Sequence, residues 1–310
     1  MGQIPSFSIC LSSQRKKRSP LPHWLKKSIP AKESALWQTN RILRKYQLST
    51  VCEEAKCPNR WECYAKKSAT FLALGRECTR SCGFCAIASS KQPPLPDAKE
   101  PEKIARATRE LELKHVVITM VARDDLADGG AEHMASIVSA IRRDSPNTTV
   151  ELLTSDFFSD QDAAINRKAI ERVLNECPDV FNHNVETVRR LSAKVRHKAT
   201  YERSLSVLEN ASRYSPSTLI KSGLMVGLGE SHEEVRETMR DLKQVGCQVV
   251  TIGQYLPPAD KKFALKKFIS PEDFEEYAQY GRETLSMQMF CGPFVRSSYH
   301  AGEVFSHATL

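Results

Sequence analysis

The chain has 310 residues, 41% of them hydrophobic and 26% charged, with a formal net charge of +8. This composition is typical of a globular protein, and the length allows one large domain or two smaller ones. No apolar run approaches the ~18 residues of a membrane-spanning helix, and no aromatic-interleaved basic patch indicates nucleic acid, so we expect neither as a partner.

The amino-terminal segment is basic. Residues 1–32 contain no acidic side chain and seven Lys or Arg, including the run Arg15–Arg18. Acid-poor, Ser-rich basic ends occur in organellar transit peptides. A secretory signal is excluded because the short apolar stretch at 9–11 precedes the basic run. Two alternatives remain, a short cytoplasmic arm and a presequence for an organellar matrix.

Residues 33–48 are predicted to form an amphipathic helix. Leu36, Ile42, Leu43 and Tyr46 lie close to helical spacing, and basic side chains fill the other side. A loop-rich segment with Pro58 is expected to follow, and it contains the first group of cysteines.

Six of the ten cysteines lie within 34 residues, in two triplets with the spacings C-x4-C-x5-C and C-x3-C-x2-C. These are Cys52, Cys57, Cys63, Cys78, Cys82 and Cys85. Thiolates are soft ligands that select zinc, copper(I) or iron–sulfur clusters. Disulfides would require an oxidising compartment, and structural zinc prefers four ligands from paired motifs. One iron–sulfur cluster per triplet would leave an iron open to a substrate or cofactor.

The rest of the chain alternates between predicted strands and helices. A first strand at 70–74 leads directly into the second cysteine triplet. Further strands are expected at 115–121, 148–153, 180–184, 219–226, 248–255 and 287–291. Helices are expected at 102–113, 132–143, 162–176, 186–195, 201–214, 232–245 and 271–286. Repeated βα units imply a parallel sheet, whose carboxyl edge collects active-site residues.

Three polar or glycine-rich stretches follow predicted strands. Gly223–Glu230 allows tight backbone turns and places Glu230 near a helix start. Asn182–Glu186 puts polar side chains at a strand end, where His183 alone is more typical of a structural histidine. Thr119–Asp125 leads into Asp128-Gly129-Gly130, which is good turn chemistry.

The C-terminal Arg296-Ser297-Ser298-Tyr299 would pass for a polar tail turn if it stood alone. Four cysteines lie outside the triplets. Structural roles are the default for Cys10, Cys177, Cys247 and Cys291, and Cys291 is the one closest to the tail motif.

The motif Cys78–Cys85, with Phe84 as its aromatic residue, resembles the radical S-adenosylmethionine (SAM) signature. Together with the upstream triplet and Arg296–Tyr299, the chain resembles the lipoyl synthase family from about Trp24 to His300. The resemblance implies a partial (β/α)6 TIM-like barrel at 69–291. It also implies an N-terminal extension at 1–68 that carries the auxiliary-cluster cysteines, and a C-terminal tail at 292–310.

The resemblance also implies the cofactors, which are two [4Fe–4S] clusters and SAM. The catalytic cluster would bind Cys78, Cys82 and Cys85. The auxiliary cluster would bind Cys52, Cys57, Cys63 and Ser298. The residues expected near SAM are Phe84, Asn184, Glu186, Gly223, Gly227 and Gly229. The family usually has an acid or Asn where this chain has Ala122, which puts a polar role there in doubt.

The implied activity is insertion of two sulfur atoms at C6 and C8 of a protein-bound octanoyl-lysine, with the auxiliary cluster as donor. The implied partners are octanoylated carrier domains of 2-oxoacid dehydrogenase E2 subunits and of the glycine cleavage H protein, an electron donor such as flavodoxin or ferredoxin, and iron–sulfur carrier proteins. The basic charge would suit an acidic carrier. The similarity of Pro22–Lys26 to the family favours a cytoplasmic arm over a presequence.

Two alternatives stay open from the sequence. One is another sulfur-inserting radical SAM enzyme, of the biotin synthase or methylthiotransferase type. The other is a non-catalytic module, either a two-cluster electron carrier or a zinc-binding protein.

Overall fold

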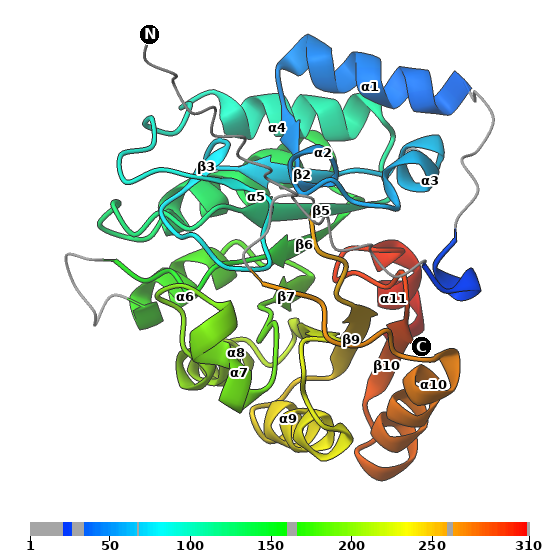
Figure 1. Cartoon of the computed structure of the whole chain (residues 1–310). Helices are drawn as coiled ribbons and strands as arrows, with labels where there is room; N and C mark the ends of the chain where they lie inside the picture. Colours follow the sequence, from blue (N-terminus) through cyan, green and yellow to red (C-terminus); the bar gives the residue numbers. More distant parts are fainter. Residues whose placement is uncertain (1–20, 27–33, 67, 160–165, 259–262, 309–310) are drawn as a thin grey trace, which may run out of the picture.

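A computed structural model describes residues 21–26, 34–66, 68–159, 166–258 and 263–308, and most of its elements surround one curved sheet (Figure 1). The eight strands of this sheet follow in the order β1 (Ser49–Thr50), β2 (Thr70–Ala73), β5 (His115–Met120), β6 (Thr149–Leu153), β7 (Val180–Asn182), β8 (Leu219–Val226), β9 (Val249–Gln254) and β10 (Gln288–Gly292). All neighbours from β2 to β10 pair in parallel. β1 pairs with β2 antiparallel.

The sheet is open, because β1 and β10 form its two edges. The strands are buried along most of their length and rich in Val, Ile and Leu, as parallel strands covered on both faces are. The predicted α/β class with a partial TIM-like barrel is confirmed, and every predicted strand is found within one or two residues.

Helices connect the parallel strands and lie around the outside of the sheet (Figure 1). They are α4 (Glu100–Glu110), α5 (Ala131–Asp144), α6 (Asn166–Leu174), α7 (Arg189–Val195), α8 (Tyr201–Tyr214), α9 (His232–Gln244) and α10 (Pro271–Gln279). Three begin at hydroxyl caps, because Thr200, Ser231 and Ser270 each accept a backbone N–H of the first turn. The helix predicted up to 286 ends at Gln279 and continues as a π-turn at Tyr280–Thr284.

The helix predicted at 186–195 begins later than expected, at Arg189. The reason is that strand pairing continues through Glu186, whose N–H donates to the Gly223 carbonyl at 3.1 Å. The Glu186 carbonyl in turn accepts from the Met225 N–H at 2.9 Å. Glu186 has φ = 67°, a left-handed conformation that a helix cannot contain.

The amino-terminal part adds helices to one side of the barrel. They are η1 (His23–Leu25), α1 (Ser34–Tyr46), α2 (Val51–Glu54) and α3 (Arg60–Ala65). The expected loop-rich segment around the first triplet is therefore wrong in part, because Thr50 caps α2 and α3 follows. The predicted boundaries at 68 and 291 remain predictions, and so does the choice between arm and presequence, because residues 1–20 lie outside the described part.

Two smaller elements complete the fold. β3 (Glu77–Cys78) and β4 (Ala88–Ser89) form a two-stranded ribbon beside the sheet. α11 (Ala301–Ala308) ends the chain, and its Val304 packs against Val180, Leu219 and Val249, the first residues of β7, β8 and β9. The tail helix thus lies at the amino edge of the strands. None of the helices described is long and apolar enough to cross a bilayer.

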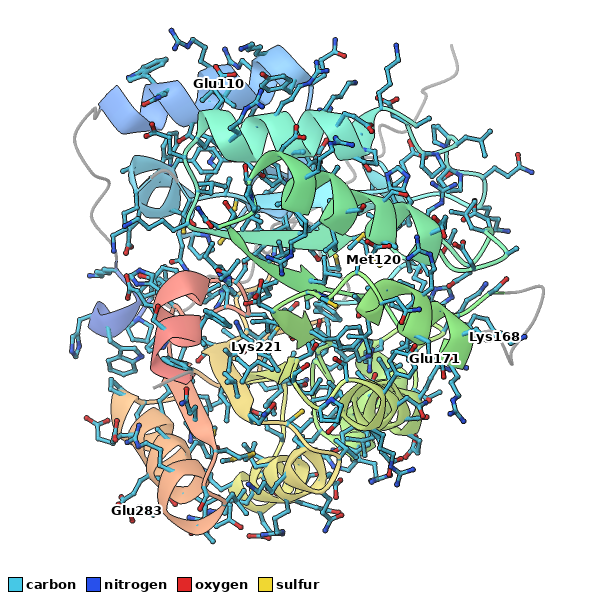
Figure 2. The ribbon with its side chains drawn as sticks, turned by 180° about the vertical axis from the view of Figure 1, so that it is seen from behind. Glu110, Met120, Lys168, Glu171, Lys221 and Glu283 are labelled. Atoms are coloured by element: carbon cyan, nitrogen blue, oxygen red, sulfur yellow. The ribbon has the colours of Figure 1, made fainter. Side chains whose placement is uncertain are left out.

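A buried ion pair lies inside the sheet. The Lys221 ammonium on β8 lies 2.9 Å from the Glu151 carboxylate on β6, and both side chains are at most 1% exposed. Figure 2 shows Lys221 among the strands, while Glu110 and Glu283 lie at the rim. Burial alone would raise the pKa of Glu151, but the Lys221 charge and bonds from His115 and Asn182 hold it at about 2.

We predict that Lys221→Met lowers the free energy of unfolding by about 3–5 kcal/mol, because it leaves the Glu151 carboxylate buried without its counter-charge. Urea denaturation followed by circular dichroism measures this. Lys243→Met, an exposed lysine on α9, is the control and should stay within about 0.5 kcal/mol of the parent.

The same ion pair makes the free energy of unfolding depend on pH in the acid range. The folded pKa of Glu151 lies below its ordinary value of 4.5, so its contribution is present above pH 4.5 and is lost as the pH falls toward 2. A Glu151→Leu/Lys221→Met double variant should recover most of the loss at pH 7. A single Lys221→Met variant as stable as the parent would contradict this account.

Candidate functional site

A cavity of about 500 Å³ lies at the carboxyl ends of the parallel strands and receives both cysteine triplets. Of the residues predicted to form the site, those that line it are Cys52, Cys57, Cys63, Cys78, Cys82, Cys85, Ser298, Phe84, Asn184, Glu186 and Gly223. Gly227 and Gly229 do not line it. Residues separated by up to 246 positions in the chain thus meet at one edge of the sheet, where a parallel α/β fold gathers its functional groups.

The second triplet lies on the loop after β2, which is latched to the loop after β5. The Thr79 N–H and hydroxyl both donate to the Ala122 carbonyl at 3.0 Å, and Thr79 Oγ1 accepts from the Asp124 N–H at 3.1 Å. Ala122 therefore acts here through its backbone. The expected departure from the family at this position leaves that contact intact.

Arg80, inside the second triplet, anchors this loop with a buried double ion pair. Its guanidinium lies 2.7 Å from an Asp124 oxygen and 2.6 Å from an Asp156 oxygen. The exposed side-chain fraction is 6% for Arg80 and 1% for each carboxylate. Burial alone would lower the pKa of Arg80, but the two carboxylates raise it. In return, Arg80 helps to hold the pKa of Asp156 at about 2 despite its burial.

The opposite side of this loop is held by the segment after α7. The Gly83 N–H donates to the Val195 carbonyl at 2.8 Å, and the His197 N–H points at Cys82 Sγ at 3.3 Å. Ser81 donates its N–H to His197 Nδ1 at 3.2 Å. The loop with the three thiols is thus fixed by bonds from the loop after β5 and from the connection between α7 and α8.

The first triplet is supported by α2 and α3. Thr50 caps α2 through the Glu53 N–H and shares a 2.7 Å hydrogen bond with the Tyr64 hydroxyl. Cys52 is 6% exposed, and Cys57 and Cys63 are half-buried. β1 joins this segment to β2, and the pairing brings the first triplet to the mouth of the barrel.

A hydrogen-bonded chain connects the C-terminal motif to the loop after β7. Ser297 Oγ donates to Asn184 Oδ1 at 2.9 Å, and Asn184 Nδ2 donates to Glu186 at 3.2 Å. A side chain at Gly223 would have its Cβ 3.0 Å from both Asn184 Oδ1 and Ser297 Oγ. Glycine at this position therefore leaves room for the contact. Burial raises the pKa of Glu186, while Arg196 and Asn184 oppose that shift.

The rest of the glycine-rich segment forms a turn. Gly227 and Gly229 have φ values of 98° and 110°, which other residues rarely adopt. Glu230 accepts from the N–H groups of Gly227 and Leu228, and so closes this turn, whereas Ser231 caps α9. Glu230 lies directly before Ser231 and is therefore near the start of α9, as the sequence predicted.

His183 has the structural role that the sequence favoured. It is 2% exposed, its Nδ1 lies 3.0 Å from the Thr154 carbonyl oxygen, and its Nε2 lies 2.9 Å from Ser204 Oγ. Burial lowers its pKa to about 4, so it is neutral at pH 7. Cys177, Cys247 and Cys291 do not line the cavity, and Cys10 lies outside the described residues.

The donor set fits iron–sulfur clusters. Burial raises the pKa of Cys52 to about 11, and the nearby Cys57 adds to this rise. Burial also raises the pKa of Cys85 to about 12, with smaller contributions from Cys78 and Cys82. Such thiols become thiolates only when a cation compensates the charge. They therefore need metal to act as ligands.

The thiol spacing also argues against a single zinc ion. Two thiolates on one zinc lie at most about 4.6 Å apart, because each Zn–S bond is about 2.3 Å long. Neither triplet brings its three sulfur atoms within 4.8 Å of one another in the part of the chain that the structure describes. A multi-iron cluster accommodates the wider spacing, and the zinc alternative loses its support.

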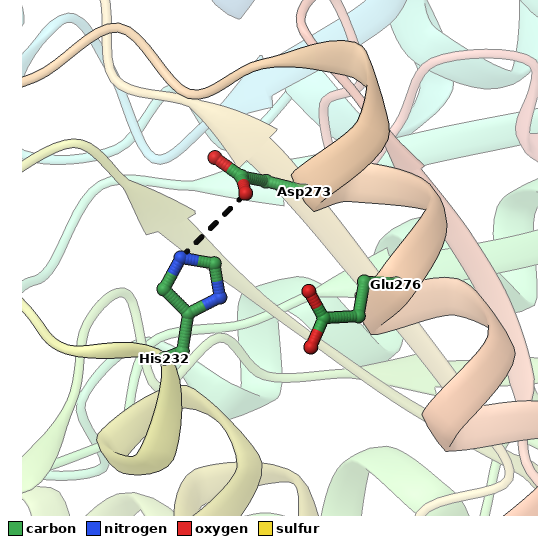
Figure 3. A group of neighbouring side chains, drawn as sticks. All are labelled: His232, Asp273 and Glu276. Carbon is green, nitrogen blue, oxygen red and sulfur yellow. Dashed lines mark ion pairs between the residues drawn. The ribbon is translucent and has the colours of Figure 1, made fainter.

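A third group of possible metal ligands lies away from the cavity, where α9 faces α10 (Figure 3). His232 Nε2 lies 3.7 Å from Asp273 Oδ1, and Glu276 completes the group. Both carboxylates are already paired, Asp273 with Lys267 and Glu276 with Arg236. This group is therefore an ion-pair network between two helices.

Sequence reasoning missed Arg80, Asp156, Arg196 and His197 as parts of the site. Arg80 was visible inside the second triplet, and Asp156 follows Thr154-Ser155 after a predicted strand, as the polar residues at 182–186 do. Nothing in the sequence pointed to Arg196 or His197, whose contacts depend on how the loop after α7 packs.

The comparisons with known proteins define the class. Residues 72–242 match the model of the radical SAM superfamily, which is more than half of the chain, so the chain belongs to this superfamily. Methylornithine synthase shares the fold with a TM-score of 0.54 at 12% identity, over 84% of this chain and 76% of that one. SuiB of Streptococcus suis, bound to S-adenosylmethionine, gives 0.53 at 12%, over 74% and 54%.

Closer relatives define the family. Residues 6–57 match the N-terminal domain of lipoyl synthase. The lipoyl synthase of Protochlamydia amoebophila is 53% identical over 289 residues, which are 93% of this chain and 87% of the relative. That of Chlamydia felis is 49% identical over 284 residues, 92% of this chain and 88% of the relative. The chain belongs to the lipoyl synthase family.

Family membership makes the protein a sulfur-inserting radical SAM enzyme and implies a [4Fe–4S] cluster and SAM as cofactors. The relatives favour this assignment over the biotin synthase, methylthiotransferase and electron-carrier alternatives.

We predict that Arg80→Gln destabilises the protein by about 3–5 kcal/mol, because Asp124 and Asp156 would stay buried without their shared partner. The matched control is Arg76→Gln, whose side chain is 65% exposed and pairs at 3.6 Å with Glu54. It should cost less than about 1 kcal/mol. Denaturant unfolding compares the two, and equal losses would show that the Arg80 network does not anchor the loop.

Proposed function

We propose that the protein converts octanoyl-lysine on a carrier protein into lipoyl-lysine, by inserting sulfur at C6 and C8 with an auxiliary cluster as the sulfur donor. The observation that carries this proposal is the single cavity at the barrel mouth, which both cysteine triplets and Ser298 line. A donor cluster must lie beside the carbon from which hydrogen is removed, and one shared cavity satisfies that requirement.

The ligand assignment follows the two triplets. Cys78, Cys82 and Cys85 would hold the catalytic [4Fe–4S] cluster and leave one iron for SAM. The auxiliary cluster would bind Cys52, Cys57 and Cys63 together with Ser298. When bound, these groups supply homolytic C–H cleavage and sulfur, which no side chain can supply alone.

The apolar part of the lining suits the substrate. Met120 and Leu224 are 8% and 3% exposed and line the cavity together with Leu153. An aliphatic octanoyl chain would bury its methylene groups against such a surface at about 0.8 kcal/mol each. Exclusion of water also protects a reactive intermediate from side reactions.

The polar part of the lining would orient SAM. Asn184 is held between Ser297 and Glu186, so the second N–H of its amide and the second lone pair of its carbonyl oxygen have a fixed direction. Phe84 and Gly223 line the same cavity, and we keep them as SAM contacts. Gly227 and Gly229 would support that contact only indirectly, since they form the turn after β8.

The partners follow from the chemistry. An octanoyl-lysine must come from a carrier domain, such as a 2-oxoacid dehydrogenase E2 subunit or the glycine cleavage H protein. Cleavage of SAM needs an electron donor such as flavodoxin or ferredoxin, and a consumed auxiliary cluster needs an iron–sulfur carrier protein. The net charge of +8 suits an acidic carrier domain.

We predict about eight irons and eight sulfides per reconstituted chain, because each [4Fe–4S] cluster contributes four of each. Replacing either triplet by alanine should leave about four. Cys177→Ala, an exposed cysteine away from the cavity, is the control and should not change the content. Zinc without acid-labile sulfide, or four irons in the parent protein, would refute the assignment.

A single anaerobic turnover tests the reaction. We predict that reconstituted protein, SAM and a strong reductant convert an octanoyl-lysine peptide into a product with two additional sulfur atoms, without added sulfide. Mass spectrometry of the peptide and of deoxyadenosine measures both halves of the reaction. Deoxyadenosine without sulfur gain would point to another substrate, and absence of both products would reject the enzyme.

A further inference from the structure

The C-terminal segment that carries Ser298 is fastened by the short stretch between Cys57 and Cys63. On the amino-terminal side of Ser298, Asn59 Nδ2 donates to the Phe294 carbonyl at 2.7 Å. Asn59 is only 1% exposed, so water competes little for this bond. The bond fixes the chain four residues before Ser298.

On the carboxyl-terminal side of Ser298, the tail is bound to Glu62, the residue just before Cys63. The Tyr299 hydroxyl donates to Glu62 Oε1 at 2.8 Å. His300 Nε2 lies 3.1 Å from the same oxygen, and the Glu62 side chain is 28% exposed. The tie therefore begins at the residue that directly follows Ser298.

Between these two ties the chain makes a tight turn. The Tyr299 N–H donates to the Arg296 carbonyl at 3.0 Å, which closes the turn around Ser297 and Ser298. Ser297 is engaged with Asn184 at 2.9 Å. The segments before and after Ser298 are thus both held, and Ser298 itself faces the cavity.

We infer that Glu62 is a positioning residue that keeps Ser298 at the first cysteine triplet. This inference rests on the proposed role of Ser298 as fourth ligand of the auxiliary cluster. A serine oxygen is a harder ligand for iron than a thiolate and the more readily released of the two. Its residence at the cluster then depends on the bonds that hold the tail, and Glu62 accepts the two bonds closest to Ser298 on the carboxyl side.

The test uses the full chain loaded with clusters. Glu62→Ala should speed amide hydrogen exchange of residues 294–300 about tenfold, while exchange in β5 and β6 stays unchanged. It should also speed loss of about half the iron to a chelator by a similar factor. Tenfold corresponds to about 1.4 kcal/mol, close to the lower limit for a hydrogen bond to a charged group.

Three further variants separate positioning from general damage. Tyr299→Phe removes only the hydroxyl and should show a smaller change in the same direction. Glu62→Gln keeps an oxygen that accepts from Tyr299, so both rates should stay closer to those of the parent protein than in Glu62→Ala. Glu303→Ala, which contacts His300 from the solvent side at 2.7 Å, is the control and should change both rates by less than about twofold.

The outcomes are distinct. Equal effects of Glu62→Ala and Glu303→Ala, or unchanged rates in both Glu62→Ala and Tyr299→Phe, would overturn the inference. Fully additive effects in the Glu62→Ala/Tyr299→Phe double variant would also overturn it, because two partners in one bond must couple. If the parent protein held only four irons, the proposed function would fail, and hydrogen exchange alone would still decide whether Glu62 ties the tail.

Discussion

The buried ion pairs of Arg80 are the interaction around which the site is arranged. One guanidinium satisfies carboxylates that follow two neighbouring strands, so the loop with the second triplet is tied to β5 and β6 at once. Two carboxylates exceed one guanidinium in charge, and Arg203 and Lys198 compensate from the outer side at 3.2 and 3.7 Å. The network then has three cationic and two anionic side chains, so the thiols beside it do not face a net negative charge.

The lining of the cavity also contains charged side chains of both signs. Arg196 and Arg296 line it together with Asp156 and Glu186. Arg196 is satisfied by neutral acceptors, among them Ser204 Oγ at 2.7 Å. Burial lowers the pKa of both arginines, although the charges of Glu186 and Asp156 oppose this shift at Arg196. Clusters ligated by three thiolates are anionic, and in the proposed function they would place further negative charge beside these arginines.

The sequence was sufficient for the parts of the fold with strong local signals. Strand positions followed from apolar runs, and the cysteine triplets followed from spacing. The start of α7 was missed because Glu186 pairs with β8, a tertiary contact that overrides helical periodicity. The contact at Ala122 could not be predicted either, because Thr79 binds the backbone carbonyl of Ala122. Every residue has such a carbonyl, so the side-chain identity does not indicate the contact. His197 and Glu62 depend on partners more than 100 and 200 residues away in the chain.

The two proposed ligand sets differ in how the chain assembles them. Cys78, Cys82 and Cys85 lie within eight residues, so the local chain brings them together, and contacts from β5, β6 and the connection after α7 fix their loop. The proposed auxiliary set would join residues 52–63 to Ser298, so closing it would require the whole barrel, the crossing of β9 by the tail, and the packing of α11 at the amino edge. Gly253 permits that crossing, because a Cβ there would lie 2.1 Å from the Val295 carbonyl oxygen. The entropy cost of closing a loop grows only slowly with its length, so the long separation in sequence adds little to this cost once the tail is anchored. If Ser298 is a ligand as proposed, it could leave while the three cysteines stay in place, which would suit a cluster that gives up sulfur.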